Sequence, residues 1–428
     1  SLYISQQIAA MAVADVLSGR NLTLALPDAL DVFPKSTPQQ QGGGADLSYG
    51  TLRFYGEVNA YLTQLLEKPL SNVDINALLL VALYQLLHDQ ADDFTVVNQA
   101  VKAAGHAKPR WAKSLVNGVL RNFLRQKEVL SEKLKTEEVA LYSYPKWWIN
   151  KLKKQYPNDW QSILEVGNTH PPMTLRVNAK QSTTEAYAKL LARQDIDVTT
   201  LGGEAVILTK PIAVEQVPGF ADGVVSVQDY GAQLAAHLLD IAPNMRVLDA
   251  CSAPGGKAGH LLELSDLALT ALDNDAGRLK RVASNLTRLD LQADLQLGSA
   301  AKWKSEQLFD RILADVPCTA SGIVRRHVDI KWLRRESDID SFTQQQAAIL
   351  ANLWHLLAKG GKLLYATCSV FAEENQQQID QFIKLNPDAT QLPLKLMDDR
   401  IEGINIQQGQ LVPAKTHDGF FYALLQKS

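Results

Sequence analysis

The stretch that decides the fold is "MRVLDACSAPGGKAGHLLEL", Met245 to Leu264. It reads as a buried strand, a turn around two glycines and then a helix. A tight glycine turn between a strand and a helix lets the backbone approach a ligand and directs helix N–H groups toward it. The stretch therefore predicts an α/β fold whose turn holds a ligand with a polar tail.

The alternation of strands and helices continues to the end of the chain. Further strand patterns occur at "LALTALDND", "FDRILADVPC", "GGKLLYATCSV" and "GFFYALLQ". Such an alternation predicts a doubly wound, mostly parallel sheet, and sheets of this kind bind ligands beyond the carboxyl ends of their strands. We therefore expect one α/β core over residues 231–428, with its site at those strand ends.

The first third of the chain predicts an all-helical domain, residues 1–141. The segment "QQIAAMAVADVLSG" ends at Gly19 as at a helix C-cap, and Asp74 precedes "INALLLVALYQLLHD" in the manner of an N-cap. Between them, Ser36 to Asp46 reads "STPQQQGGGAD". Because proline, glutamines and three glycines cluster there, we expect a mobile loop within the domain.

A small α/β module is predicted over residues 142–230. It opens with a proline break and a Trp-rich basic helix in "LYSYPKWWINKLKKQYPNDW", and strand patterns follow at "PMTLRVN", "AVILT" and "VVSVQD". Its aromatic and basic residues suit stacking and pairing with RNA. Trp147 and Trp148 nevertheless suit core anchors better than platforms for bases.

A basic segment lies in the helical domain, from Val101 to Lys127, and contains no acidic residue. Within it Lys113, Asn117, Arg121 and Arg125 recur every four residues on one helical face, while apolar residues form a stripe on another. Two interpretations stay open: a solvated helix face, or a face that meets nucleic-acid phosphates.

Composition limits the class of protein. The chain of 428 residues has a formal charge of −3, so a nucleic-acid partner must be held by local patches. We find neither a run of apolar residues long enough for a membrane helix nor a signal peptide, and we expect a cytoplasmic monomer without a membrane partner. The three cysteines form no C-x-x-C pair and the histidines do not cluster in sequence, so we expect free thiols and no metal.

The glycine turn and the next strand together predict a nucleoside-containing cofactor. The turn "DACSAPGGK" matches neither G-x-G-x-x-G nor G-x-x-x-x-G-K-[ST], which disfavours hydride transfer and ATP hydrolysis. Asp273 ends the next strand, about 20 residues beyond the turn, where an acid hydrogen-bonds ribose hydroxyls.

At these residues the sequence resembles the S-adenosylmethionine-dependent RNA (cytosine-5) methyltransferases, in particular the bacterial type that modifies small-subunit ribosomal RNA. The matching stretches are "LDACSAPGGK", "ALDND", "DRILADVPCTASGIVRRHVDIKWLR", "YATCSV" and "DGFFYA". The resemblance extends over essentially the whole chain. It implies a NusB-like RNA-binding domain at the N-terminus, an RRM-like module, and a Rossmann-like S-adenosylmethionine-dependent methyltransferase core.

The resemblance also implies which residues contact the cofactor, S-adenosylmethionine. The turn would supply Cys251, Ser252, Ala253, Pro254, Gly255, Gly256 and Lys257. Asp273 would bind the ribose, and Asp315 would contact cofactor or substrate. Ser299 stands where the family usually has an acid that reaches the adenine, which predicts weaker cofactor binding or an altered activity.

The chemistry at C5 of cytosine explains the cysteines. C5 becomes nucleophilic when a thiolate adds to C6, and the thiol must therefore be activated by a nearby cation, for which Lys257 and Arg325 are candidates. In the family that the chain resembles, the residue equivalent to Cys368 attacks C6, the residue equivalent to Cys318 assists adduct breakdown, and Asp315 contacts N3. A cysteine in isolation is more often an inert small hydrophobe, which is also how we interpret Cys251.

The segment "RRHVDIKWLR" has two interpretations. Arg325, Arg326 and Lys331 form either a salt-bridged surface turn or a set of phosphate contacts beside a base drawn from its stack. We favour contact with RNA.

The sequence thus predicts methyl transfer to C5 of a cytosine in small-subunit (16S) ribosomal RNA. The alternatives are the same chemistry on transfer RNA, or an RNA-binding assembly factor with a vestigial core, which the Ser299 departure would suit.

Overall fold

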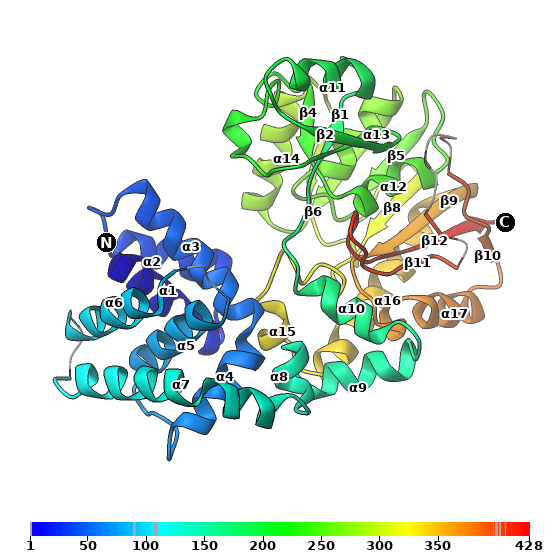
Figure 1. Cartoon of the computed structure of the whole chain (residues 1–428). Coiled ribbons are helices and arrows are strands. Elements are labelled where there is room, and N and C mark those ends of the chain that lie inside the picture. Colours follow the sequence, from blue (N-terminus) through cyan, green and yellow to red (C-terminus); the bar gives the residue numbers. More distant parts are fainter. Residues whose placement is uncertain are drawn as a thin grey trace. The chain divides into compact units, whose positions relative to one another are not determined.

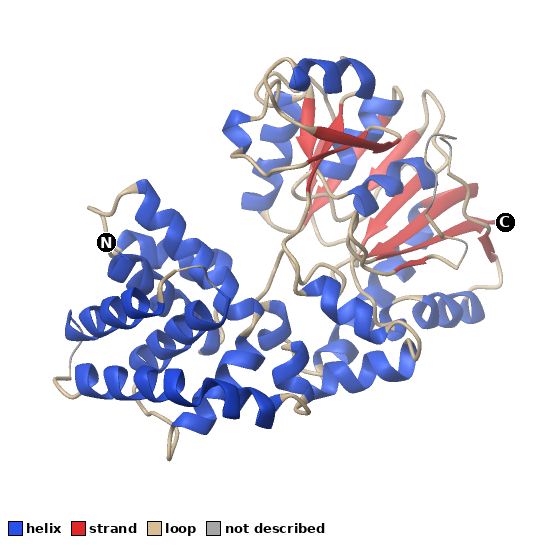
Figure 2. Cartoon of the chain, viewed as in Figure 1, coloured by secondary structure: helices blue, strands red, loops and turns tan. Residues whose placement is uncertain are grey.

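The computed structural model describes residues 2–88, 91–106, 109–396, 398, 401, 404–406 and 408–428. These residues form two compact units (Figures 1 and 2). One unit comprises Ser1–Thr169 and Val324–Glu336, and the other comprises His170–Ile323 and Ser337–Ser428. The division of the sequence at residues 142 and 231 stays a prediction.

The first unit is helical throughout its described residues, as Figure 2 shows. Its buried aliphatic side chains form one continuous core around α1. The helices are α1 (Leu2–Leu17), α2 (Leu22–Asp31), α3 (Pro38–Arg53), α4 (Tyr55–Leu65), α5 (Val73–His88), α6 (Asp93–His106), α7 (Ala112–Leu134), α8 (Glu138–Tyr142), α9 (Lys146–Gln155), α10 (Trp160–Gly167) and α15 (Ile330–Leu333).

The prediction of a mobile loop at residues 36–46 is wrong, because most of this segment forms the first half of α3. The Thr37 hydroxyl accepts a hydrogen bond from the Gln40 N–H, and the Gln40 side chain accepts one from the Thr37 N–H. This capping box, followed by a proline at the first helical position, starts a helix despite the three glycines. Two of those glycines, Gly43 and Gly44, let α3 pack closely against Ser5 and Ile8 of α1.

The two helix-end predictions fare differently. Gly19 has a φ of +108° just after α1, as expected of a C-cap glycine. Asp74 does not cap α5, because the Asn72 side chain accepts the hydrogen bond from the Ile75 N–H at 2.9 Å. Asp74 lies instead in the first turn of the helix, where its charge still complements the helix dipole. Trp148 of α9 is buried, as predicted for a core anchor.

The second unit contains a small four-stranded antiparallel sheet in the order β2-β3-β1-β4. One helix, α11, packs on it, and the buried side chains of α11 and the strands form a core of their own. The elements are β1 (Met173–Val177), α11 (Thr184–Ala192), β2 (Val198–Gly202), β3 (Ala205–Leu208) and β4 (Val225–Val227).

The larger sheet has the order β10-β12-β9-β8-β5-β6-β7, with β11 paired to β12 (Figure 1). The strands from β9 to β7 along this order pair in parallel, and the others are antiparallel, so the predicted mostly parallel sheet is confirmed. Its strands are β5 (Arg246–Asp249), β6 (Ala268–Asp273), β7 (Asp294–Leu297), β8 (Phe309–Asp315), β9 (Leu357–Thr367), β10 (Ala389–Leu392), β11 (Gln410–Leu411) and β12 (Phe420–Lys427).

Helices cover both faces of this sheet. Successive residues of a strand enter different cores: Val247 lies in the core with α12, α13 and α14, and Leu248 lies in the core with α16 and α17. Burial on both faces explains the runs of consecutive apolar residues in β8 and β9. The helices are α12 (Tyr230–Leu238), α13 (Gly256–Leu264), α14 (Ala276–Arg288), α16 (Asp338–Leu356) and α17 (Gln376–Leu385).

Among the helices of the described residues, none combines the length and the apolar character needed to cross a lipid bilayer.

Candidate active site

The register of the parallel strands brings the predicted site residues to one edge of the sheet. Asp249 ends β5, Asp273 ends β6 and Asp315 ends β8. Asp249 pairs in register with Leu313 of β8 and with Ala271 of β6. The carboxyl ends of parallel strands form the ligand-binding edge of a doubly wound sheet, so the three acids share that edge.

The glycine turn after β5 lies against the neighbouring strand end. The Ser252 N–H donates to the Leu272 carbonyl at 2.9 Å, and the Ala253 N–H donates to the Asp273 carboxylate at 3.1 Å. Gly255 has a φ of +96°, and a side chain there would approach Val282 to 3.2 Å. The turn therefore needs glycine for its backbone conformation, and α13 begins directly after it at Gly256.

Asp249 carries a buried acceptor without a partner. One carboxylate oxygen accepts from the Ser252 hydroxyl at 2.9 Å, while the other has no hydrogen-bond partner among the described residues. Burial raises the pKa of Asp249 to about 7, and the nearby charge of Asp315 adds to the effect. An unpaired buried carboxylate beside a helix-opening turn fits a ligand that carries positive charge, as S-adenosylmethionine does.

Lys257, in the first turn of α13, reaches across to β8. Its amine donates to the Asp315 carboxylate at 2.6 Å. Burial alone lowers the pKa of Lys257, but the charge and hydrogen bond of Asp315, together with the charge of Cys368, raise it above its usual value. Lys257 is therefore a cation near the thiol, as the sequence predicted for one of its two candidates. Arg325, the other candidate, belongs to the helical unit.

The two cysteines predicted to act on the base lie side by side. Asp315 of β8 pairs in register with Ala366 of β9, so the loops that follow the two strands leave from the same point. The Cys318 and Cys368 sulfurs are 3.4 Å apart, within hydrogen-bonding distance. Cys318 is buried, whereas Cys368 is partly exposed.

The surroundings of Cys318 favour its protonated form. The hydrogen bond with Cys368 raises the pKa of the Cys318 thiol well above its usual value, and burial and the charge of Glu374 raise it further. The Ala320 N–H, 3.4 Å from the sulfur, opposes this only in part. Cys318 therefore holds a proton that it can donate to Cys368.

The remaining cofactor predictions lie close to these residues. Cys251 is in the turn, and burial raises the pKa of its thiol, in keeping with an inert turn residue. Ser299 is exposed just beyond β7, and its neighbour Gly298 donates its N–H to the Asp273 carbonyl at 2.9 Å. Ser299 therefore lies one strand end beyond the predicted ribose acid.

Two of the predicted RNA contacts in residues 325–331 are wrong, because their side chains are buried. Arg325 is 2% exposed. The Lys331 amine donates to the carbonyls of Arg53 and Ser143 at 2.7 and 2.8 Å and to the Asn168 side chain at 2.8 Å. Lys331 thus connects residues 325–331 to the rest of the helical unit through hydrogen bonds. Arg326 is partly exposed and stays a predicted contact.

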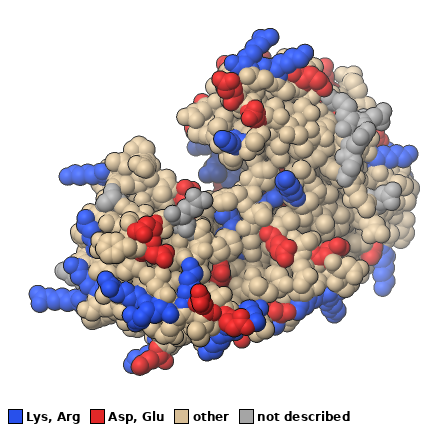
Figure 3. Space-filling model, in the orientation of Figure 1, with Lys and Arg blue, Asp and Glu red and all other residues tan. Residues whose placement is uncertain are grey.

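The basic face predicted on α7 is present. Lys113, Arg121 and Arg125 are exposed, while Val116, Leu120 and Phe123 of the same helix are buried. Figure 3 shows Lys and Arg side chains gathered over the region of α7. Ala107 and Lys108 of the predicted basic segment lie outside the described residues.

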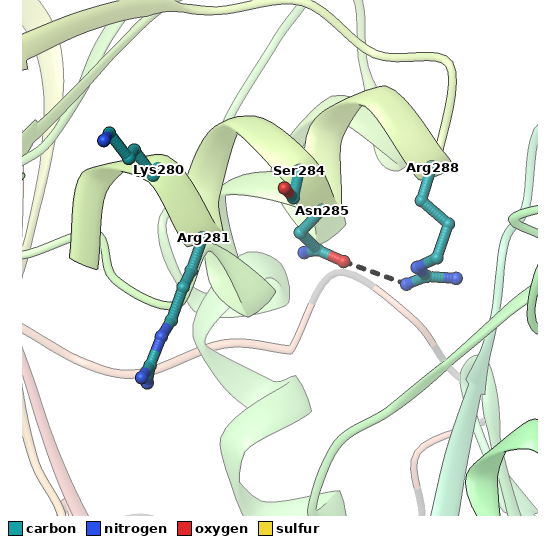
Figure 4. Close-up of a pocket in the computed structure, with 5 residues that line it drawn as sticks. All are labelled: Lys280, Arg281, Ser284, Asn285 and Arg288. Carbon is teal, nitrogen blue, oxygen red and sulfur yellow. Dashed lines mark hydrogen bonds between the residues drawn. The ribbon is translucent and has the colours of Figure 1, made fainter. Parts of the chain in front are cut away.

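A second basic surface, on α14, was missed by the sequence analysis. An open pocket of about 360 Å³ is lined by Lys280, Arg281, Ser284, Asn285 and Arg288 (Figure 4). Arg288 is held by the Phe220 and Val225 carbonyls and the Ser226 hydroxyl, whereas Lys280 and Arg281 are exposed. The recurrence of basic residues at helical spacing after "ALDND" was the signal that could have revealed it.

Two histidines that are distant in sequence meet in the second unit. His237 of α12 and His260 of α13 each place Nε2 near one oxygen of Glu204, at 2.7 and 3.1 Å. All three side chains are buried and offer ligand atoms within 4.8 Å of one another. Histidines that do not cluster in sequence therefore come together in the fold. Both distances suit N–H donors to a carboxylate, so we interpret the group as a hydrogen-bonded cluster.

Comparison with protein families matches three consecutive parts of the chain. Residues 236–426 match the family described as 16S rRNA methyltransferase RsmB/F, and residues 144–215 match its ferredoxin-like domain. Residues 4–125 match the NusB family. These matches agree with the predicted order of a NusB-like domain, a small α/β module and a methyltransferase core.

Curated relatives extend over the whole chain. Ribosomal RNA small subunit methyltransferase B of Pseudomonas syringae pv. tomato is 40% identical, covering 98% of this chain and 96% of the relative. The protein of the same name from Pasteurella multocida is 42% identical over 100% of this chain and 96% of the relative.

Solved structures show the same fold. The crystal structure of PH0851 covers 99% of both chains with a TM-score of 0.80 at 23% identity, which supports the fold alone. A methyltransferase homologue from Pyrococcus horikoshii is 27% identical with a TM-score of 0.59, over 68% of this chain and 98% of its own.

Proposed function

Because the chain belongs to the family of ribosomal RNA small subunit methyltransferase B, we propose that it methylates C5 of a cytosine in small-subunit (16S) ribosomal RNA, using S-adenosylmethionine and a covalent cysteine adduct. The observation that supports the adduct is the pair of sulfurs of Cys318 and Cys368, 3.4 Å apart at the end of two parallel strands. Methylation at a ring nitrogen or at a ribose oxygen requires no such pair.

The residues of the turn and of the neighbouring strand ends suit the cofactor. The unpaired oxygen of Asp249 offers an acceptor to a positively charged group, and Asp273 lies at the position of a ribose ligand. S-adenosylmethionine, when bound, supplies the methyl group that C5 accepts. Ser299 leaves the adenine without the usual acid, so we expect weaker binding than in relatives that keep it.

Cys368 is the proposed nucleophile. It is partly exposed, it lies near the Lys257 cation, and its sulfur is 3.4 Å from the sulfur of Cys318. Its thiolate forms a bond to C6, and the electron pair of the C5–C6 double bond becomes available at C5. Asp315, at the end of β8, is the proposed hydrogen-bonding partner of the N3 edge of the cytosine as electron density moves into the ring.

Cys318 is the proposed base for release. Once Cys368 carries the base as a thioether, the hydrogen bond that raised the pKa of Cys318 most is gone, and Cys318 can lose its proton to solvent. The thiolate then accepts the proton from C5, the C5–H electron pair restores the C5–C6 double bond, and Cys368 leaves as a thiolate.

A denaturing gel of wild type, Cys318→Ala and Cys368→Ala tests the adduct after incubation with small-subunit ribosomal RNA and S-adenosylmethionine. We expect a slow protein–RNA band in Cys318→Ala alone, because that variant forms the bond to C6 but lacks the base for release. A band in Cys368→Ala alone would reverse the two roles.

Transfer RNA is the competing substrate. Matched methyl-acceptance assays with unmodified small-subunit ribosomal RNA and transfer RNA decide between them, and the NusB match favours the ribosomal substrate. Methyl transfer to transfer RNA alone would contradict the proposal while leaving the cysteine chemistry intact.

A further inference from the structure

A buried carboxylate lies between the two loops that carry the thiols. Glu374 is 0% exposed and belongs to a short 3-10 turn, Ala372–Glu374, after β9. Nothing in the chemistry proposed above uses it. Burying a carboxylate is costly unless several donors compensate it, so its partners are informative.

Four donors surround Glu374: two belong to Thr319, one to Ser369 and one to Gln346 of α16. The Thr319 N–H and hydroxyl donate to its two oxygens at 2.8 and 2.6 Å. The Ser369 hydroxyl donates to the oxygen that also accepts from the Thr319 hydroxyl. The Gln346 amide donates at 3.2 Å and also contacts the Pro317 carbonyl at 3.0 Å.

These contacts join the loop of Cys318 to the loop of Cys368. Thr319 directly follows Cys318, and Ser369 directly follows Cys368. The two loops are linked further by the Gly322 N–H, which donates to the Cys368 carbonyl at 2.8 Å, and by the hydroxyls of Ser321 and Ser369, 3.0 Å apart. Glu374 is the carboxyl group at the centre of this network. Burial raises its pKa, and the hydrogen bonds from Ser369, Thr319 and Gln346 oppose that rise and stabilise the charged form.

Several ionisable groups act on the thiol pair from the surrounding elements. Cys368 and Glu374 lie on the β9 side, and both raise the pKa of Cys318. Tyr365 of β9 donates its hydroxyl to the Glu374 carbonyl at 2.6 Å, and burial holds its pKa well above the usual value, so it stays neutral. The cation Lys257 of α13 is paired with Asp315 and acts on Cys368.

We propose that Glu374 is a positioning residue that holds the two cysteine loops together and, through its negative charge, keeps the proton of the thiol pair on Cys318. Cys318 then keeps its proton, and Cys368 is the sulfur that attacks. The inference rests on the roles proposed for the two thiols, but it concerns the protein without RNA.

Glu374→Gln removes the negative charge of the side chain while keeping its size and shape. The amide oxygen can still accept from Thr319 and Gln346, and the amide N–H can donate to hydroxyls that rotate to accept it. Glu373→Gln is the matched control, because it removes the same charge one residue away from a partly exposed side chain.

The measurement is the pH midpoint of iodoacetamide alkylation at Cys318 in the full-length, RNA-free protein, read by mass spectrometry of its peptide. The Cys251 peptide serves as an internal reference. In wild type we expect a midpoint above the value of about 8.5 for free cysteine. In Glu374→Gln we expect the midpoint to fall by about one pH unit, a tenfold increase in thiolate at a given pH. Glu373→Gln should match wild type.

Equal Cys318 midpoints in wild type, Glu373→Gln and Glu374→Gln would overturn the proposal. If Glu374→Gln does not fold, the wild-type profile decides, because a Cys318 midpoint at or below that of free cysteine contradicts a proton held there. Alkylation needs neither RNA nor S-adenosylmethionine, so failure of the methylation proposal would leave this result unaffected.

Discussion

At the scale of single residues, the burial of a charged side chain decides whether it can contact a partner or instead stabilises the fold. Lys331 was predicted to contact RNA, yet its amine is buried among three oxygen acceptors. Burial lowers the pKa of Lys331 well below its usual value, and the charge of Arg53 adds to the effect. A side chain in that position stabilises the helical unit.

Lys331→Met should therefore destabilise the protein by about 3 kcal/mol, because three buried acceptors lose their donor. Lys113→Met, at an exposed position, should change stability by less than about 0.5 kcal/mol. Denaturant unfolding of both variants measures the difference, and equal effects would refute the structural role of Lys331.

Asp273 is the proposed ribose ligand, so cofactor affinity should depend directly on its carboxylate. Asp273→Ala removes the proposed ribose acceptor and the acceptor of the Ala253 N–H. We expect S-adenosylmethionine affinity to fall by at least about tenfold, the loss of one charge-assisted hydrogen bond. Isothermal titration calorimetry checks this, with Asp294→Ala, exposed on β7, as the control. Unchanged affinity in Asp273→Ala would place the ribose elsewhere.

At the scale of elements, α3 shows that glycines in a helix serve close packing. A side chain at Gly44 would come within 2.7 Å of Ile8, whereas one at Gly42 would meet nothing within 4 Å. The same substitution should therefore have opposite effects two residues apart.

Gly44→Ala should lower the free energy of unfolding by about 1–3 kcal/mol through overpacking against α1. Gly42→Ala should raise it by roughly 0.5–1 kcal/mol, because alanine is the better helix former. Thermal unfolding of the two variants is the measurement. Destabilisation by both would indicate that α3 is not helical at this point.

At the scale of the whole molecule, the cluster of Glu204, His237 and His260 joins the small sheet to the helices of the larger one within the second unit. Burial lowers the pKa of His260 to about 3, although its hydrogen bond to Glu204 raises it in part. An unfolded histidine takes up a proton near pH 6.5, which the folded one does not accept until much lower pH. The contribution of the neutral, buried His260 to the free energy of unfolding is therefore present above about pH 6.5 and is lost as the pH falls below that value.

Between pH 7.5 and 5.5 this histidine alone should lower the free energy of unfolding by about 1.4 kcal/mol. His260→Gln, which keeps an N–H donor without the titration, should show a flatter dependence. Thermal unfolding at pH 7.5 and 5.5 compares the two proteins. Parallel pH profiles would show that His260 is not the titrating group.

RNA binding is also a property of the whole molecule, since it depends on exposed charge. The triple variant Lys113→Ala, Arg121→Ala, Arg125→Ala should bind small-subunit ribosomal RNA more weakly. The slope of log affinity against log salt should become less steep by about 0.7–0.9 for each lost phosphate contact. Filter binding over a salt series tests this, with Lys189→Ala on α11 as the control. An unchanged slope in the triple variant would leave the α7 face as a solvated surface.

The sequence by itself determined the doubly wound core, the helical domain and the set of site residues at the strand ends. Strand and helix periodicity are local properties, and the glycine turn, Asp273 and the two cysteines follow their strands directly in sequence. The same local logic identified the apolar and basic faces of α7.

Only the tertiary structure decided which side chains are buried and which meet. The capping box and the packing of α1 outweigh the loop-forming composition of residues 36–46, and long-range contacts bury Lys331 and Arg325. The 3.4 Å contact of the two thiols, the Glu374 network and the histidine cluster join residues 5–56 positions apart. These contacts depend on the register of β8 and β9 and on the packing of α12 and α13. Neither can be predicted from a local sequence pattern.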